Sequence, residues 1–139
     1  MKYNDIINAV KTAITNGSTG LSAVYSELQE EFSVYPHAVI LPIGHTNEIR
    51  DMAHNVRTYR FLVRVAINIE GQETAAQIKL RDLVDKVINV LEDQDNIELS
   101  GVIDWAEATD ATFRFSGDPA KHYFGEISYS IKVRFNRRA

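Results

Sequence analysis

The stretch YRFLVRVAINIE, residues 59–70, decides the fold class. Apolar side chains fill its odd positions from Tyr59 to Ile69, and most even positions carry charged or amide side chains. A period of two puts alternate side chains on opposite faces of a strand, with one face buried and the other largely polar. At ~3.3 Å per residue this strand is near 40 Å long, above the usual length. The sequence therefore predicts a long, half-buried strand of an antiparallel sheet.

Other strands are predicted on both sides of this one. Residues 127–135 alternate as regularly, from Ile127 to Phe135. Residues 38–41 form a short apolar run between Pro36 and Pro42, which indicates a short buried strand. Weaker strands are expected around 102–103 and 112–115, before a turn at 116–119.

Two amphipathic helices are predicted. The first spans residues 4–15, with Asn4 as its cap and a stop at Asn16-Gly17. The second runs from a capping box, Thr74 with Gln77, to about Asp93. Its apolar side comprises Ala76, Leu80, Leu83, Val84, Val87, Ile88 and Leu91. Residues 21–35 allow two interpretations, an amphipathic helix or a short strand at 23–25 followed by an acidic loop.

Residues 44–56 are polar and lack a sustained period, which predicts a long surface loop. Long half-buried strands need a cover for their apolar faces, and the two helices can supply it. We therefore expect an α+β fold, with a mostly antiparallel sheet of four to five strands packed against two main helices. A chain of 139 residues fits a single domain, residues 1–139.

Composition limits the function classes. The formal net charge of −4 argues against a protein that mainly grips nucleic-acid phosphates. No cysteine is present, so disulfides, thiolate metal sites and a cysteine nucleophile are excluded. The N-terminus does not resemble a signal peptide, and no apolar run approaches the ~20 residues that span a bilayer. We expect a protein made in a cytoplasm.

Motifs of catalysis are missing from the sequence. It contains no GxxxxGK[ST], GxSxG or HExxH pattern, and Gly17-Ser-Thr-Gly20 lacks the lysine of a phosphate loop. The polar segment carries His45, Glu48, Asp51 and His54, which could in principle gather around a cation, but a polar loop naturally collects such residues and a solvated loop is the favoured interpretation. No enzyme site, metal site or cofactor is expected.

Two further groups allow more than one interpretation. Acidic residues flank Trp105, at Asp104, Glu107 and Asp110, and exposed turns explain them better than an acid–base pair in a cleft. We expect Trp105 in the core or at a subunit interface. Basic residues end the chain, at Lys132, Arg134, Arg137 and Arg138. They could contact nucleic acid or an acidic partner, although charged outer faces commonly protect strand edges from aggregation.

Several local patterns together resemble a known family. They are Tyr35-Pro36 before the strand Ala38–Pro42, and the segment Asn55–Phe61 that leads into the long alternating strand. The amphipathic helix, then Leu99-Ser-Gly101 and the closing strand Ile127–Phe135, complete the order. Over residues 21–136 this order is similar to the tail terminator and tail-completion proteins of long-tailed bacteriophages and prophages.

The resemblance implies a structural role without catalytic residues. Proteins of that family form a ring, typically a hexamer, that docks on the last ring of the tail tube, stops its polymerisation and offers a surface to the head. It implies as partners other copies of the chain, the tail tube protein and a head completion or connector protein. It implies a location in the host cytoplasm and then in the virion. Contacts would fall on the central polar segment and the basic strand end, at Asn47, Glu48, Arg50, Arg57, Arg134 and Arg137.

Three alternatives stay open at the level of sequence. A head-side connector or neck protein would have the same size and fold class. A small metal-dependent hydrolase would use the segment from His45 to His54, and a nucleic-acid-binding module would use Lys132 to Arg138. We expect no membrane partner and no specific nucleic acid.

Overall fold

The structure is a computed structural model that describes residues 3–29, 34–49, 54–69, 73–93, 103–116 and 122–136, with only the backbone for a few residues at element ends. Within these described residues, two helices and five strands follow one another. They are α1 (Tyr3–Asn16), β1 (Ala23–Tyr25), β2 (His37–Ile49), β3 (His54–Asn68), α2 (Glu73–Glu92), β4 (Ile103–Ser116) and β5 (His122–Asn136).

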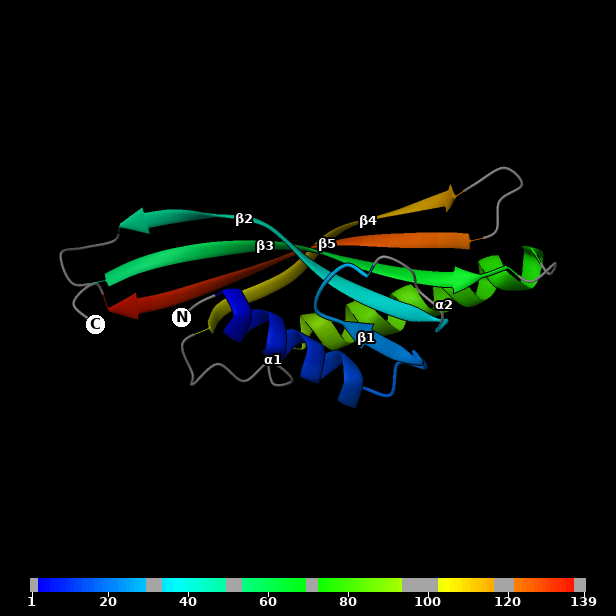
Figure 1. The fold of residues 1–139 in the computed structure, drawn as a ribbon. Coiled ribbons are helices and arrows are strands. Elements are labelled where there is room, and N and C mark those ends of the chain that lie inside the picture. The colour runs from blue at the N-terminus through cyan, green and yellow to red at the C-terminus, as the bar shows by residue number, and fades with distance from the viewer. Residues whose placement is uncertain are drawn as a thin grey trace.

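The five strands form one twisted sheet in the order β1-β2-β3-β5-β4 (Figure 1). The pair β1–β2 is parallel, and the pairs β2–β3, β3–β5 and β5–β4 are antiparallel. The longest ladder joins β3 to β5, from His54 opposite Asn136 to Asn68 opposite His122. This is the α+β fold expected, with a mostly antiparallel sheet and two helices.

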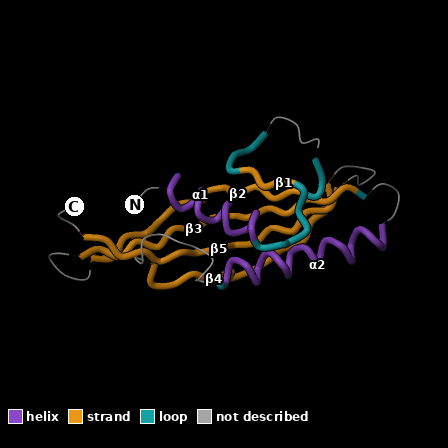
Figure 2. Tube along the Cα trace, turned by 90° about the horizontal axis from the view of Figure 1, so that it is seen from below, coloured by secondary structure: helices purple, strands orange, loops and turns teal. Residues whose placement is uncertain are grey.

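Both helices lie on the same face of the sheet (Figure 2). We call it the helix-side face and the opposite one the outer face. Alternation decides which side chains reach the helices, because successive residues of a strand point to opposite faces. Tyr59, Phe61, Val63 and Val65 of β3 are all 0% exposed in this core. The alternating pattern of residues 59–67 was therefore a correct guide to the buried face.

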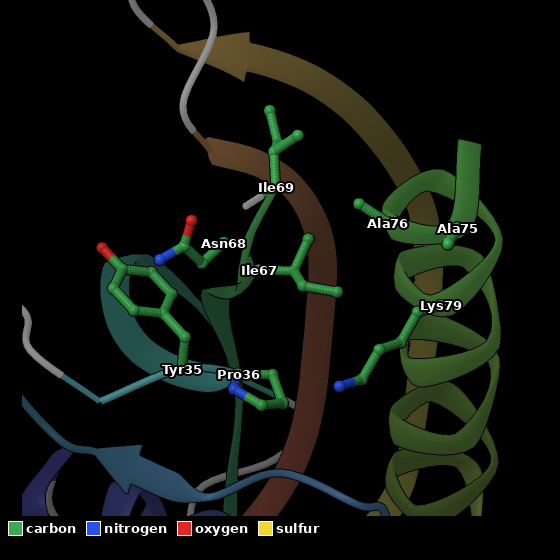
Figure 3. Close-up of a pocket in the computed structure, with 8 residues that line it drawn as sticks. All are labelled: Tyr35, Pro36, Ile67, Asn68, Ile69, Ala75, Ala76 and Lys79. Atoms are coloured by element: carbon green, nitrogen blue, oxygen red, sulfur yellow. The ribbon is translucent and has the colours of Figure 1, made fainter. Parts of the chain in front are cut away.

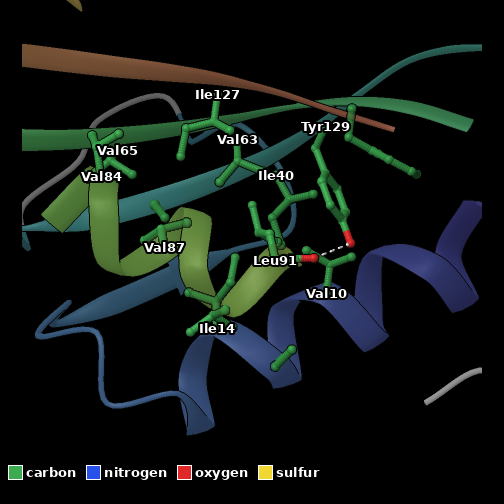
Figure 4. Close-up of a cluster of buried hydrophobic side chains, with 14 of the residues drawn as sticks. Val10, Ile14, Ile40, Val63, Val65, Val84, Val87, Leu91, Ile127 and Tyr129 are labelled. Carbon is green, nitrogen blue, oxygen red and sulfur yellow. Dashed lines mark hydrogen bonds between the residues drawn. The ribbon is translucent and has the colours of Figure 1, made fainter. Parts of the chain in front are cut away.

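The helices add their apolar sides to the same core (Figure 4). Ile6, Val10 and Ile14 of α1 and Val87 and Leu91 of α2 are buried. The hydroxyl of Tyr129, from β5, donates a hydrogen bond of 3.0 Å to the carbonyl oxygen of Leu91. Burial raises the pKa of that hydroxyl, since removal from water disfavours the phenolate.

The two helices approach each other closely at the end of α1. A Cβ atom at Gly17 would lie 2.5 Å from Cγ2 of Val90, a separation that no real side chain tolerates without a shift. Gly17 thus ends α1 after Asn16, as predicted, and its lack of a side chain lets Val90 of α2 pack closely against the end of α1. Helix α2 begins at Glu73, so Thr74 lies inside its first turn and does not precede it as a capping residue would.

The largest error of the sequence interpretation concerns residues 44–56. The predicted surface loop is wrong, because β2 continues to Ile49 and β3 begins at His54. The short strand predicted at 38–41 is the first part of β2. Asn47, Glu48 and Thr46 are all exposed, so no buried face imposes an alternating pattern there and the segment looks irregular in sequence.

Two other expectations change. The two weak strands near 102–103 and 112–115 are parts of one continuous strand, β4, which has register shifts at Ile103/Trp105 and Ala108/Asp110. These irregularities interrupt its alternation. Of the two interpretations for residues 21–35, the short strand is correct for 23–25. The predicted turn at 116–119 lies largely outside the described residues, as does the side chain of Trp105.

Candidate assembly surfaces

One end of the sheet extends beyond the helices (Figure 1). We call this part the arm and define it as residues 44–49 of β2, 54–58 of β3 and 132–136 of β5. Its strands stay in register, with Thr46 opposite Thr58 and Thr58 opposite Lys132. Beyond its base, where His45 meets Tyr3 of α1, no described helix lies against it in either view (Figures 1 and 2). The arm therefore presents both of its faces beyond the helix-covered part of the sheet, which we call the body.

The base of the arm is tied to the start of α1. The hydroxyl of Tyr3 and Nδ1 of His45 lie 2.6 Å apart. The ring of Tyr3 meets that of Tyr59 edge-on, with 4.9 Å between centroids, and also contacts Phe61. These contacts fix where the helix-covered part ends and the arm begins.

A polar contact continues this cluster along the arm. Arg57 donates from Nε to Oδ1 of Asn47 at 2.7 Å and from Nη1 to the hydroxyl of Tyr59 at 3.0 Å. Its guanidinium carbon also lies 5.6 Å from the centroid of the Tyr59 ring. Asn47 and Arg57 are direct partners in the β2–β3 ladder. The contacts hold a cation on the helix-side face of the arm in one geometry.

The structure places four of the six candidate contact residues named from sequence in the arm, two on each of its faces. Asn47 and Glu48 are exposed on β2, and Arg57 bonds to Asn47. The backbone of Arg134 lies in β5 opposite Val56, which itself pairs with Glu48, so Arg134 belongs to the same part of the arm. Arg50 and Arg137 lie outside the described residues.

The outer face of the body carries a charged cluster that the sequence did not reveal. Glu126, whose side chain is 10% exposed, accepts from Nη2 of Arg64 at 3.1 Å and from Nε of Arg114 at 2.8 Å. Arg64 also lies over the ring of Phe124, 5.7 Å from its centroid. The three charged residues come from three adjacent strands, so only the sheet order brings them together.

Beside this cluster lies a group of rings on the outer face. The ring of Tyr35 stacks on His122 at 4.9 Å and contacts His37 at 4.8 Å. Nδ1 of His37 donates to the carbonyl oxygen of Val34 at 2.8 Å, which fixes the proton on that nitrogen. Burial lowers the pKa of His37, and the nearby His122 and Arg64 lower it further, against the opposing effect of the Val34 bond. His37 is thus a buried, neutral side chain that fastens residues 34–37 to the sheet.

The sheet has a free edge on each side. Strand β1 pairs only with His37–Val39, so no described strand pairs with β2 from Ile40 to Ile49 on that side. Strand β4 closes the order on the other side and pairs with β5 alone among the described strands. Each edge displays an apolar side chain, Ile43 at 59% exposure on β2 and Phe113 at 47% on β4. Exposed edges of this length readily accept another strand.

A hollow of about 240 Å³ lies where β3 ends near the start of α2 (Figure 3). Its lining combines polar and apolar groups, and the side chain of Lys79 extends from α2 toward it. Its residues are Tyr35, Pro36, Ile67, Asn68, Ile69, Ala75, Ala76 and Lys79. Among the residues that line it there is no carboxylate and no histidine, and Lys79 is the charged side chain at its rim.

The described part of the chain contains no group of three or more histidine and acidic residues placed to hold a metal ion. His45 and His54, which the sequence suggested as possible ligands, lie on β2 and β3, and Asp51 falls outside the described residues. Among the described helices, none has the length and apolar character needed to cross a membrane.

Comparison with known proteins adds a likeness of fold. No family model matches the sequence, and no curated protein matches it. Among solved structures, a chain from the virion of a native gene transfer agent (GTA) particle superposes with a TM-score of 0.69 at 15% identity. The likeness covers 96% of this chain and 100% of that chain. A second solved chain, 18% identical, superposes with a TM-score of 0.50 over 97% of both chains.

Proposed function

We propose that this chain is a structural virion protein, a single tail terminator-like domain over residues 1–139. In this proposal it forms a ring, typically of six copies, that caps the end of a tail tube, ends the growth of the tube and offers a surface to the head. It assembles in the host cytoplasm and stays in the virion at the junction of tail and head. Its work is done by surfaces and not by catalysis.

The observation that carries the proposal is the shared fold with a virion chain. The likeness to the gene transfer agent chain runs over nearly the whole of both chains, so it involves the complete arrangement of helices and strands. The sequence resemblance to tail terminators rests on other grounds, the order of motifs over residues 21–136. The likeness of fold supports a structural component of a virion, and the sequence resemblance is our reason for assigning that component to a tail.

The two free edges of the sheet favour a ring. A ring needs a heterologous interface, in which two different patches of one subunit meet their counterparts on the neighbours. The free parts of β2 and β4 lie on opposite sides of the sheet, so each subunit can accept one neighbour at each side. A symmetric dimer would use one patch twice and would leave the other edge exposed.

The arm is the part we assign to the neighbouring ring of the tube or the head. It projects beyond the body and carries polar side chains on strands that stay paired to one another (Figure 1). We propose Asn47, Glu48, Arg50, Arg57, Arg134 and Arg137 as its contact residues. The bonded pair Arg57–Asn47 would enter such a contact with its geometry already fixed, which reduces the entropy lost on binding.

The test begins with the purified chain. Native mass spectrometry over a range of concentrations should show a closed multimer, with six copies as the expected mass, and negative-stain images should show rings. Mixed with polymerising subunits of the tail tube of the same particle, the protein should give short tubes that carry a ring at one tip only. Tubes that grow to the same length with and without the protein, with bare tips, would refute the proposal.

A matched variant connects the arm to this activity. Arg57→Ala should leave the ring mass unchanged and weaken tube capping. The control variant Arg81→Ala, which removes a charge on the exposed side of α2, should change neither. If the ring binds isolated heads and ignores tubes, the chain is a head-side connector and the terminator role is wrong.

A further inference from the structure

The two free edges of the sheet have matching direction. Strand β4 is antiparallel to β5, β5 is antiparallel to β3, and β3 is antiparallel to β2, so β4 runs opposite to β2 within one subunit. A second copy that continues the sheet the same way up would thus place its β4 antiparallel to β2 of the first. Antiparallel pairing is slightly more stable per residue than parallel pairing, and strand addition to an exposed sheet edge is a recurring mode of recognition.

The two edges also match in their irregularities. Strand β2 has one extra residue between Pro42 and Gly44, and β4 has one between Ala108 and Asp110. Suppose that His45 of one copy lies opposite Ala108 of the next in the added ladder. The extra residues Ile43 and Thr109 then lie on the two sides of a single pair, Gly44 with Asp110. The pairs that follow are Gly44 with Asp110, Pro42 with Ala111, and Ile40 with Phe113.

Every one of these pairs joins side chains on the same face. Positions 40, 42 and 45 share the helix-side face with their ladder partners Val63, Phe61 and Tyr59, and positions 108, 111 and 113 share it with Tyr129, Ile127 and Gly125. Gly44 and Asp110 belong to the outer face through Arg60 and Ser128. If the register shifted by one residue, each helix-side residue of one strand would lie opposite an outer-face residue of the other along the whole ladder.

Side chains near the two edges are complementary in charge. A Cβ atom at Gly44 would lie 3.6 Å from Nη2 of Arg60, so the exposed guanidinium of Arg60 lies over Gly44 at the edge of β2. On the edge of β4, Glu107 and Asp110 are exposed on the outer face. The pairing described above brings Asp110 of one copy next to Arg60 of the other.

Apolar exposure falls in the same places. Phe113 is about half exposed at the free edge of β4, and it would lie beside Ile40 at the point where β1 stops covering β2. Ile43, the extra residue of β2, is 59% exposed and would lie beside the added strand. Pairing therefore removes from water two of the large apolar side chains that a single copy exposes.

We propose that the free edge of β4, residues 106–113, adds to the free edge of β2, residues 40–47, of a second copy of this chain, so that the sheets of neighbouring subunits join into one. The inference rests on the proposed ring and names its subunit interface. It identifies Arg60 and Asp110 as an intersubunit ion pair. It also assigns the exposed Phe113 to the contact, and it separates this interface from the arm.

The chain has no cysteine, so engineered cysteines report the contact directly. Thr46 and Glu107, both exposed on the outer face, are direct partners in the proposed ladder. The double variant Thr46→Cys with Glu107→Cys should form a ladder of disulfide-linked multimers under mild oxidation, up to the ring size, and the ladder should collapse to monomer on reduction. Each single variant should stay unlinked, and an equal mixture of the two single variants should stop at dimers.

The control places the second cysteine on the same strand but out of reach. Arg114 is exposed on the outer face of β4, and at ~3.3 Å per residue it lies about 20 Å from Glu107 along the strand, far beyond the span of a disulfide. Thr46→Cys with Arg114→Cys should therefore give no ladder. Equal ladders from the two double variants, or none from the first, would overturn the proposal.

Charge reversal supplies a second, independent readout. Asp110→Arg should reduce the association constant of the ring by about tenfold or more, since it opposes two cations at the interface. Adding Arg60→Asp should restore association, with folding monitored by circular dichroism throughout. Normal ring formation by the Asp110→Arg variant would refute the proposed interface. It would not bear on tube capping, which the tube assay tests separately. If the protein caps tubes but the double cysteine variant forms no cross-link, the proposed function stands and the proposed β2–β4 subunit interface is wrong.

Discussion

The three strands of the arm, β2, β3 and β5, continue into the body, and the two regions differ in what covers them. In the body, Phe61 and Val63 are fully buried under α1 and α2. In the arm, residues 46–48 of β2 are exposed, and among its described side chains only Val56 and Val133 are buried. The backbone ladder continues through both without a break between β3 and β5.

The difference shows that pairing and packing are separable in this fold. Hydrogen bonds between strands satisfy the backbone groups in the arm, but each contributes only about 1 kcal/mol net. Burial of apolar surface, at about 25 cal/mol per Å², is concentrated in the body. Changes in the body should therefore act on stability, and changes in the arm should act on binding.

The largest contrast is expected for truncation of a core side chain. Leu91→Ala removes a fully buried side chain that packs between α1 and the sheet, and should cost about 2–5 kcal/mol. Thr46→Ala, on an exposed position of the arm, should stay within about 0.5 kcal/mol. Chemical denaturation followed by circular dichroism measures both. Equal losses would show that the arm is packed as tightly as the body.

Two glycines sharpen the same contrast. A Cβ atom at Gly125, in the body, would lie 2.5 Å from Cγ2 of Val84, so Gly125→Ala should cost about 1–3 kcal/mol. The cost should shrink when Val84→Ala is added, because the colliding methyl group is then absent. At Gly44, near the base of the arm, the nearest atom would be 3.6 Å away, and Gly44→Ala should have little effect on unfolding. A large loss at Gly44, or an unchanged cost in the double variant, would contradict this account.

A smaller effect is expected within the arm. Arg57→Ala removes the bonds to Asn47 and Tyr59 and should lower the free energy of unfolding by less than about 1 kcal/mol, because Asn47 is exposed and Arg57 is only partly buried. Thermal unfolding measures the change, with Asn47→Ala as the partner variant and the double variant closing the cycle. A loss above about 2 kcal/mol would mean that the arm contributes to the stability of the body.

The smallest effect is a pH dependence in the body. His37 is buried in its neutral form and its pKa is lowered in the folded state. The imidazole of His37 therefore binds a proton more readily in the unfolded chain than in the folded one. The stability from this residue is present above pH 6.5 and is lost as the pH falls through the lowered pKa of the folded state. His37→Gln should remove that part of the decline in urea midpoint between pH 7 and pH 5, while His45→Gln, at the arm, should keep it. The same decline in both variants would assign it to other groups.

Sequence alone predicted the body well because burial leaves a periodic signal. The alternation from Tyr59 to Ile67 and the apolar side of α2 follow directly from contact with the core. The helix boundaries came within one or two residues of the structure, since Gly17 interrupts the first helix where it meets Val90. Fold class followed from these elements.

The arm and the edges could not be predicted in the same way. Residues 45–48 are exposed on both faces, so a strand and a loop have the same appearance in sequence. The bulges in β4 split one strand into two weak signals. The Arg64–Glu126–Arg114 cluster depends on the strand order β3-β5-β4, which no local pattern encodes. Of the candidate contacts, Asn47 and Arg57 were chosen for their polarity, and their mutual bond emerges only from the register.

The long β3–β5 ladder has a consequence for how the chain folds. The hairpins β2–β3 and β4–β5 each join strands that are close in sequence, so they can form within microseconds. The ladder between them pairs residues 54 to 82 positions apart, with α2 in the connection. Closing that separation costs entropy before any contact is gained, and such nonlocal pairing slows folding. We therefore expect two hairpins that form early and a single slow step in which β3 and β5 meet, the point at which all five strands become one sheet.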